Sequence, residues 1–312
     1  MGLSLRDMQE ALYLTMGEMF SPTAINRATL RMQSRMEAEK TTPFPATPPI
    51  LLVDGVWVDI QYTGDGIKID RAGHQRQERH AEERVILVAM AVWPDERYHI
   101  LHYEVATDER EATWSKMLTN MIARGLQPTE VELVVSDGTN GLLSAMKTYL
   151  PTAQLQRCIT HKVRGMKPYL TYQHLPTHDD EGKPIDKKRA KAERWQELKR
   201  DAYDIYDADS LETAQQCLIE FCDKWTECEP KAIHAFNYSI ERTLCFYNFA
   251  PELWRHIRTT NHLERFFREF RTRADEIGAF PNEESCLTLF YIAMLRDHAK
   301  HQRFDVAKTL RH

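Results

Sequence analysis

The sequence lacks any hydrophobic run long enough to cross a membrane. No segment approaches the roughly 18 consecutive apolar residues that a transmembrane helix needs. The N-terminus has no basic segment followed by an apolar core and a cleavage site. We therefore expect no membrane partner, and a protein that stays in the compartment where it is made.

The sequence has few cysteines and no regular spacing between them. All six lie in the second half of a 312-residue chain, which is large enough to fold without disulfides. We interpret them as reduced thiols, and Cys217, Cys222 and Cys228 as core residues of one helical stretch. Cys158 and His161 form a Cys-x-x-His pair, which is half of a zinc site by spacing. No second pair follows at a suitable distance.

An excess of positive charge is also lacking, since the formal net charge is −5. Phosphate binding needs clustered basic side chains, so their distribution matters more than the sum. Three clusters stand out: Lys162, Arg164 and Lys167; then Lys183, Lys187, Lys188, Arg189 and Lys191; then Arg255, Arg258, Arg265, Arg268, Arg271 and Arg273. A solvated surface is the alternative interpretation of any charge run, and we favour it for the run 183–191.

The N-terminal part reads as helices followed by a linker. Residues 3–37 show helical spacing, and Ser21-Pro22 supplies a capping residue and a first-turn proline. The pattern fits a helix-turn-helix that reads DNA and a simple packed pair equally well. Residues 41–49 are too rich in proline to continue a helix, so a new domain is expected to begin after them.

Short apolar runs from residue 50 onward predict strands, and longer periodic segments predict helices. The expected strands are 50–53, 85–92, 99–105, 131–135 and 154–158, with helices at about 110–124 and 140–149. This order indicates a mixed sheet with helices packed on it. Beyond about residue 167 the sequence is helical. The charged stretch 64–83 is a poor match to the short turn expected between the first two strands.

Two aspartates follow buried strands in the same way. Asp54 ends the run 50–54 and Asp137 ends the run 131–137, and each precedes a glycine. Side chains at the carboxyl ends of such strands gather where α/β sheets bind ligands. A tight turn at each Asp-Gly pair, or a helix cap at Asp137, are the alternatives.

A third carboxylate, Glu264, lies on a predicted helix. Helical spacing places Leu263, Phe267 and Phe270 on one apolar stripe and Glu264 on a neighbouring face with Arg268 and Arg271. This face is either a surface salt-bridge ladder or an anion-binding face that carries a metal ligand. Glu269, on the same helix, is the rival ligand.

Three sequence blocks resemble the signatures of the Mutator-type transposases of bacterial insertion sequences. They are 135–141 (VSDGTNG), 156–164 (QRCITHKVR), and 259–265 (TTNHLER) followed by 278–285 (GAFPNEES). The resemblance implies an α/β fold of the ribonuclease H-like type, a mixed sheet with flanking helices, interrupted by an all-helical insertion domain. The implied domains are 1–40 (helical, DNA-binding remnant), 41–49 (linker), 50–167 (core), 168–255 (insertion) and 256–312 (core with the glutamate).

The same resemblance implies a DDE transposase, in which Asp54, Asp137 and Glu264 are catalytic and hold Mg²⁺ or Mn²⁺, with two ions expected. Implied partners are transposon-end and target DNA, with a homodimer or higher assembly on DNA. A cytoplasmic, nucleoid-associated location follows if the source is prokaryotic. The implied DNA-contacting residues are His161, Lys162, Arg164, Arg265, Arg268 and Arg271. The implied positioning residues are Cys158, His161 and Asn261.

Two other functions stay open. One is a ribonuclease H-like nuclease without strand transfer, and the other is a truncated or domesticated DNA-binding relic without catalysis. The second is considered because only some forty residues precede the linker, whereas the family usually carries a longer helical DNA-binding region there.

Overall fold

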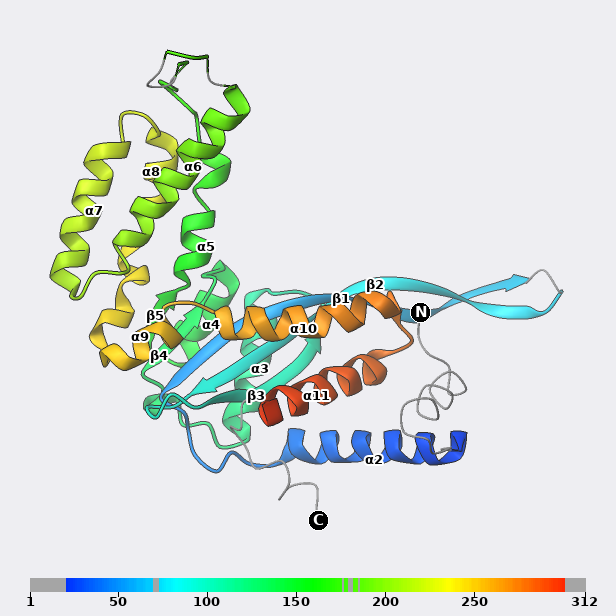
Figure 1. Ribbon diagram of the computed structural model, residues 1–312. Coiled ribbons are helices and arrows are strands. Elements are labelled where there is room, and N and C mark those ends of the chain that lie inside the picture. The colour runs from blue at the N-terminus through cyan, green and yellow to red at the C-terminus, as the bar shows by residue number, and fades with distance from the viewer. Residues whose placement is uncertain (1–20, 70–72, 176, 179–181, 185, 301–312) are drawn as a thin grey trace. The chain divides into compact units, whose positions relative to one another are not determined.

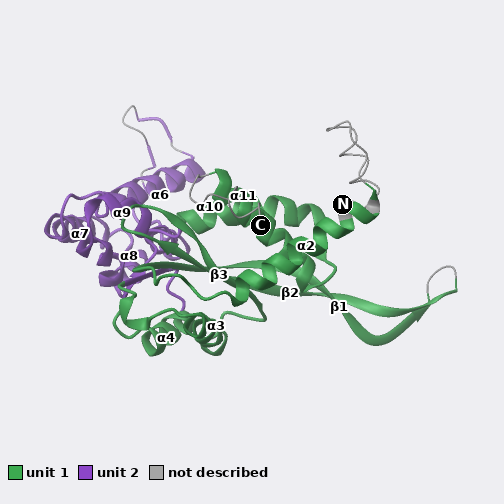
Figure 2. Ribbon diagram, turned by 90° about the horizontal axis from the view of Figure 1, so that it is seen from below, with its two compact units in different colours: residues 1–132, 140–153, 261–312 green, residues 133–139, 154–260 purple. Residues whose placement is uncertain are grey.

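The computed structural model describes the chain except residues 1–20, 70–72, 176, 179–181, 185 and 301–312. The first helix of the predicted helix-turn-helix lies outside the described residues. Two compact units are present (Figure 2). Unit 1 contains residues 1–132, 140–153 and 261–312, and unit 2 contains residues 133–139 and 154–260. Among the described helices, none has both the length and the apolarity to span a membrane.

Unit 1 is built on a mixed sheet. Strand β1 (Ile50–Ile69) pairs antiparallel with β2 (Gln75–Val92), which pairs antiparallel with β3 (Tyr98–Ala106). The short β6 (Ala279–Phe280) adds to β1 in parallel. Fully buried aliphatic residues fill Ile50–Val53 and Val85–Val92, which explains why both runs are apolar at every position.

Helices cover both faces of this sheet. In Figure 2, α3 (Glu111–Ala123) and α4 (Asn140–Tyr149) lie on one face, and α2 (Pro22–Thr41), α10 (Asn261–Ile277) and α11 (Glu283–Lys300) lie on the other. A 3-10 turn, Pro128–Glu130, follows α3. The chain is therefore a mixed α/β protein with a mixed sheet and flanking helices, as the sequence predicted.

Unit 2 joins two parallel strands to a set of helices. Strand β4 (Leu133–Ser136) pairs with β5 (Gln154–Arg157). The helices are α5 (Ile159–Arg164), α6 (Lys187–Asp204), α7 (Leu211–Trp225), α8 (Pro230–Asn237) and α9 (Pro251–Ile257), with 3-10 turns at Lys167–Tyr169, Ile240–Thr243 and Cys245–Asn248. The segment predicted as an insertion thus shares a compact unit with β4 and β5. The predicted domain boundaries stay predictions.

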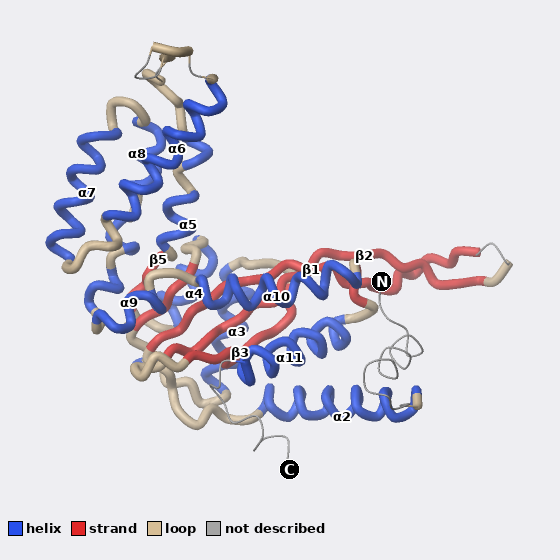
Figure 3. The backbone as a smooth tube through the Cα atoms, in the orientation of Figure 1, coloured by secondary structure: helices blue, strands red, loops and turns tan. Residues whose placement is uncertain are grey.

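The first two strands are much longer than predicted. Strand β1 continues sixteen residues beyond Val53, and β2 begins ten residues before Val85. The charged stretch 64–83 is the outer part of this hairpin, which Figure 3 shows as a long two-stranded ribbon. The prediction that Asp54 ends a strand was therefore wrong, because backbone pairing with β2 continues where the apolar run stops.

Candidate active site

Asp54 lies inside β1, where strand pairing fixes its direction. It is register-paired with Val88, and Val88 with Tyr103, so the three side chains share one face of the sheet. The ring of Tyr103 packs against Phe290 of α11 at a centroid distance of 4.8 Å. Asp54 therefore points toward the layer of α10 and α11. Its Oδ1 also accepts a hydrogen bond from the Gly55 N–H at 2.8 Å.

The next residue, Gly55, faces the opposite layer. A Cβ at this position would collide with the carboxylate of Glu109 and with Val85, so the site accommodates only glycine without a shift of its neighbours. Glu109 precedes α3, and its Oε2 accepts a hydrogen bond from Trp57 Nε1 at 3.3 Å. The carboxylate of Glu109 therefore lies beside the residue next to Asp54, but on the opposite face of the sheet from the Asp54 side chain.

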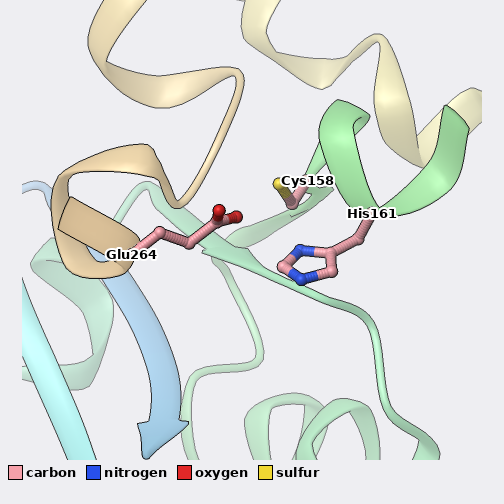
Figure 4. Close-up of side chains that lie close together, drawn as sticks. All are labelled: Cys158, His161 and Glu264. Carbon is pink, nitrogen blue, oxygen red and sulfur yellow. The ribbon is translucent and has the colours of Figure 1, made fainter. Parts of the chain in front are cut away.

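Glu264 belongs to the first turn of α10, which packs against β1 in the same unit. Leu263, Phe267 and Phe270 are buried, as the apolar stripe predicted, and Phe266 is buried beside them. Glu264 is half-buried, and Figure 4 shows its side chain extending from the helix. The rival ligand, Glu269, forms an ion pair with Lys300 of α11 at 2.9 Å. Asp54 and Glu264 therefore lie in the same layer of unit 1.

Asp137 directly follows β4 in unit 2, as predicted from the sequence. Its Oδ1 accepts a hydrogen bond from the Thr139 N–H at 3.1 Å, and Gly138 adopts a φ of +86° that favours glycine. Arg157 lies along this turn and donates from Nε to the carbonyl of Asp137 at 3.1 Å. Arg157 was not among the predicted site residues, although it lies near the end of the predicted strand 154–158; in the structure it is register-paired with Ser136.

Two of the sequence blocks meet in unit 2. The Ile159 N–H donates to the carbonyl of Arg258 at 3.1 Å, and the Thr260 N–H donates to Cys158 Sγ at 3.4 Å. Both Cys158 and Thr260 are fully buried. The start of α5 thus holds the segment that runs directly into α10 and Glu264. The positioning role of Cys158 stays a prediction.

The Cys-x-x-His pair forms a close contact within unit 2. The ligand atoms of Cys158 and His161 lie within 4.8 Å of each other (Figure 4). Burial by itself would raise the pKa of the Cys158 thiol, but hydrogen bonds from His161 and Thr260 outweigh it, so the pKa lies below its usual value. The pair is a preorganised polar group, and not an apolar core contact.

The predicted DNA-contacting residues separate into exposed and buried ones. Arg164, Arg265, Arg268 and Arg271 are exposed, and Asn261, predicted to position, is exposed as well. Lys162 is only 3% exposed and donates to the carbonyls of Ala235 and Tyr238. Burial, together with Arg157, lowers the pKa of Lys162 to about 8. This placement argues against a phosphate contact, because the ammonium already serves backbone carbonyls inside unit 2.

Comparison with known proteins identifies the family. The model of the Mutator transposase family matches residues 1–304, so the chain belongs to that family. It is 27% identical over 297 residues to the transposase for insertion sequence element ISRM5 of Rhizobium meliloti, covering 95% of this chain and 65% of that protein. It is 25% identical to the IS905 transposase of Lactococcus lactis, covering 95% of this chain and 66% of that protein.

The chain thus spans about two thirds of the length of these curated relatives. Among solved structures, the Drosophila P element transposase strand transfer complex aligns with a TM-score of 0.44 at 10% identity, covering 94% of this chain and 92% of that one.

Proposed function

We propose that this chain is a DNA transposase that cleaves transposon ends and transfers the strand into target DNA by a DDE mechanism in a ribonuclease H-like core. The observation that carries the proposal is the placement of Asp54 and Glu264 in one layer of unit 1, on the strand and helix where the family resemblance puts two of its three carboxylates. Family membership supports the same reaction class.

The donor set fits hard divalent cations. Asp54, Asp137 and Glu264 offer carboxylate oxygens, which are the ligands that Mg²⁺ and Mn²⁺ prefer. Asp54 and Asp137 are each oriented by a backbone N–H on Oδ1. When bound, two such ions activate the attacking oxygen and stabilise the leaving one in an in-line displacement.

Basic residues next to the proposed carboxylates would bind and orient the DNA. Arg265, Arg268 and Arg271 form an exposed basic row along α10, beginning one residue after Glu264, and would contact phosphates next to the scissile bond. The Cys158–Thr260 contact, inside unit 2, fixes the residue that directly precedes that helix in the chain. In the first step, water attacks the phosphodiester at the transposon end and frees a 3′-hydroxyl. In the second step, this 3′-hydroxyl attacks a phosphodiester of the target DNA, and the 3′-oxygen of the target strand leaves. Two ends must be joined together, so we expect a dimer or higher assembly on DNA.

The test is cleavage and joining of a labelled duplex that carries the terminal sequence of the encoding element, in Mg²⁺ or Mn²⁺. Asp54→Asn, Asp137→Asn and Glu264→Gln should each lose metal-dependent products by at least about a hundredfold. Matched controls are Asp59→Asn, exposed on the same strand, and Glu269→Gln, on the same helix. Cleavage without joining would replace the proposal by a nuclease, and DNA binding without either reaction would replace it by a non-catalytic relic.

A further inference from the structure

Two segments of unit 2 that pack against each other contain no acidic residue. Residues 154–175 run through β5, α5 and the 3-10 turn Lys167–Tyr169, and residues 230–240 run through α8. We call these two segments the acid-free strip. Of the carboxylates that adjoin it in sequence, Glu229 is buried and Glu241 is exposed. The basic residues of the strip are Arg157, Lys162, Arg164, Lys167 and Lys231.

The two segments are joined at both ends of α8, which Figure 1 shows in the helical part of unit 2. At the end of α8, Lys162 Nζ donates to the carbonyls of Ala235 at 3.1 Å and Tyr238 at 2.5 Å. Just before its start, the carboxylate of Glu229 accepts a hydrogen bond from the Thr171 N–H at 2.6 Å. The strip is therefore one continuous structure, although its halves are far apart in the sequence.

The strip exposes basic and aromatic side chains together. Lys167 and Lys231 are exposed, and neither has an ion-pair partner among the described residues. Tyr169 is 52% exposed and Tyr238 is 72% exposed, the highest value among the large hydrophobic side chains described. Ammonium groups bind phosphates, and aromatic rings stack on bases.

The backbone that carries Tyr238 is both fixed and strained. Its N–H donates to the carbonyl of His234 at 3.2 Å, and its carbonyl accepts from Lys162, which is only 3% exposed. The next residue, Ser239, has a φ of +54°, in the left-handed region that residues other than glycine rarely adopt. Strain of this kind gathers at ligand-binding sites. The buried lysine and the strained turn thus present a ring that the fold itself leaves in water.

The charges of unit 2 are segregated. Helix α7 carries the carboxylates of Glu212, Glu220 and Asp223 against one lysine, Lys224, and α6 carries both signs. An anion would therefore be attracted to the acid-free strip and repelled by α7. A nucleic acid strand combines repeated negative charges with flat rings, which matches both kinds of side chain that the strip exposes.

We propose that the acid-free strip is a further DNA-binding surface, which holds a strand with unpaired bases. Lys167 and Lys231 contact the phosphates of this strand. Tyr169 and Tyr238 stack on its bases, which requires unpaired bases because those inside a duplex present only their edges. The proposal rests on the proposed function for the class of ligand, and it adds side chains of unit 2 to the basic row along α10.

The experiment measures binding of the full chain to a labelled oligothymidylate from low to high salt, and cleavage of the end duplex beside it. One variant combines Tyr169→Ala with Tyr238→Ala, and its match combines Tyr169→Phe with Tyr238→Phe, which keeps both rings. Another combines Lys167→Gln with Lys231→Gln. Controls on other helices are Ile219→Ala, at an isoleucine that is 54% exposed on α7, and Arg200→Gln on α6. Thermal unfolding of each variant checks that the fold is retained.

The alanine variant should bind the oligothymidylate at least about fivefold more weakly, because the loss of one stacked base already costs about that factor. The phenylalanine variant and the controls should bind like the intact chain. The lysine variant should lower the slope of log K against log salt by about 1.4, since each phosphate contact of a single strand contributes about 0.7.

Three results would overturn the proposal. If the intact chain cleaves the end duplex, but affinity and slope for the oligothymidylate are unchanged in the alanine and lysine variants, the strip alone is overturned. If polyglutamate binds as tightly as the oligothymidylate, and only the lysine variant weakens both, an acidic protein partner replaces DNA. An intact chain that neither binds nor cleaves DNA overturns the proposed function and the strip together.

Discussion

The ring of Tyr98 on β3 packs against the imidazole of His262 on α10, with centroids 3.9 Å apart. His262 lies two residues before Glu264, so this contact ties the first turn of α10 to the sheet that carries Asp54. Aromatic contacts of this kind contribute about 0.5–1.5 kcal/mol beyond burial. A small shift of the proposed catalytic carboxylate of Glu264 would be costly for rate, so we infer that the contact positions it.

We expect His262→Ala to lower the cleavage rate by about tenfold or more while leaving DNA affinity unchanged, because a misplacement of about 1 Å can cost up to about a hundredfold. His262→Phe, which keeps a ring against Tyr98, should recover most of the rate. Single-turnover cleavage and equilibrium binding on one duplex separate the two effects. Equal losses in the Ala and Phe variants would show that the imidazole acts through its nitrogens instead.

Gly55→Ala should destabilise unit 1. The added Cβ would collide with the Glu109 carboxylate and Val85 in a packed layer, and overpacking of this kind costs about 1–3 kcal/mol. Gly64→Ala, on the same strand, is the control, because its Cβ would meet its nearest neighbour at 3.6 Å. Denaturant unfolding of both variants measures the difference. Equal stability of the two would mean that Glu109 moves away at no cost.

The buried carboxylate of Glu229 should be a main support of unit 2. It is 0% exposed and accepts hydrogen bonds from the backbone N–H groups of Thr171 and Tyr172, with Arg194 at 3.5 Å. Removing the charge while Arg194 stays should cost about 3 kcal/mol. Glu229→Gln and the exposed control Glu227→Gln are compared by thermal unfolding. A control variant that loses as much as Glu229→Gln would contradict the assignment.

His99 should make the stability of unit 1 fall in mild acid. Burial, helped by the charge of Arg97, lowers the pKa of His99 to about 4 from a usual 6.5. Between these two values the unfolded chain binds the proton and the folded chain does not, so stability is full above about pH 6.5 and falls as the pH drops toward 4. The loss approaches about 3 kcal/mol for a shift of this size. Urea unfolding at pH 4.5 and pH 7 should show this loss, and His99→Phe should reduce it. An unchanged pH dependence in the variant would assign the effect to other groups.

An exposed and a buried basic residue should differ in their effect on the salt dependence of DNA binding. Arg265→Gln should reduce the salt slope of DNA binding by about 0.9, as one phosphate contact requires. Lys162→Met should leave that slope unchanged, because Lys162 is buried and serves two backbone carbonyls. Filter binding from low to high salt measures both. A reduced slope in a correctly folded Lys162→Met protein would restore Lys162 to the DNA-contacting set.

Much of the fold followed from the sequence because burial leaves a periodic signal. The helices at 111–123 and 140–149, the buried strand cores and the apolar stripe of α10 are where the pattern predicted them. The outer hairpin was missed because it is exposed on both faces and charged, so it has no hydrophobic period. Its strands are held by backbone hydrogen bonds, which side-chain patterns do not report.

By itself, the sequence determined the class of fold, the strand end at Asp137 and the family blocks around Cys158 and Glu264. Only the tertiary structure decided which face each residue occupies. Register placed Asp54 with the layer of α10 and Glu109 against the opposite layer, and packing buried Lys162 among carbonyls while it left Arg265 exposed. The physical reason is that the direction and the burial of a side chain depend on residues far away in the sequence that pack against it, and local spacing does not specify those residues.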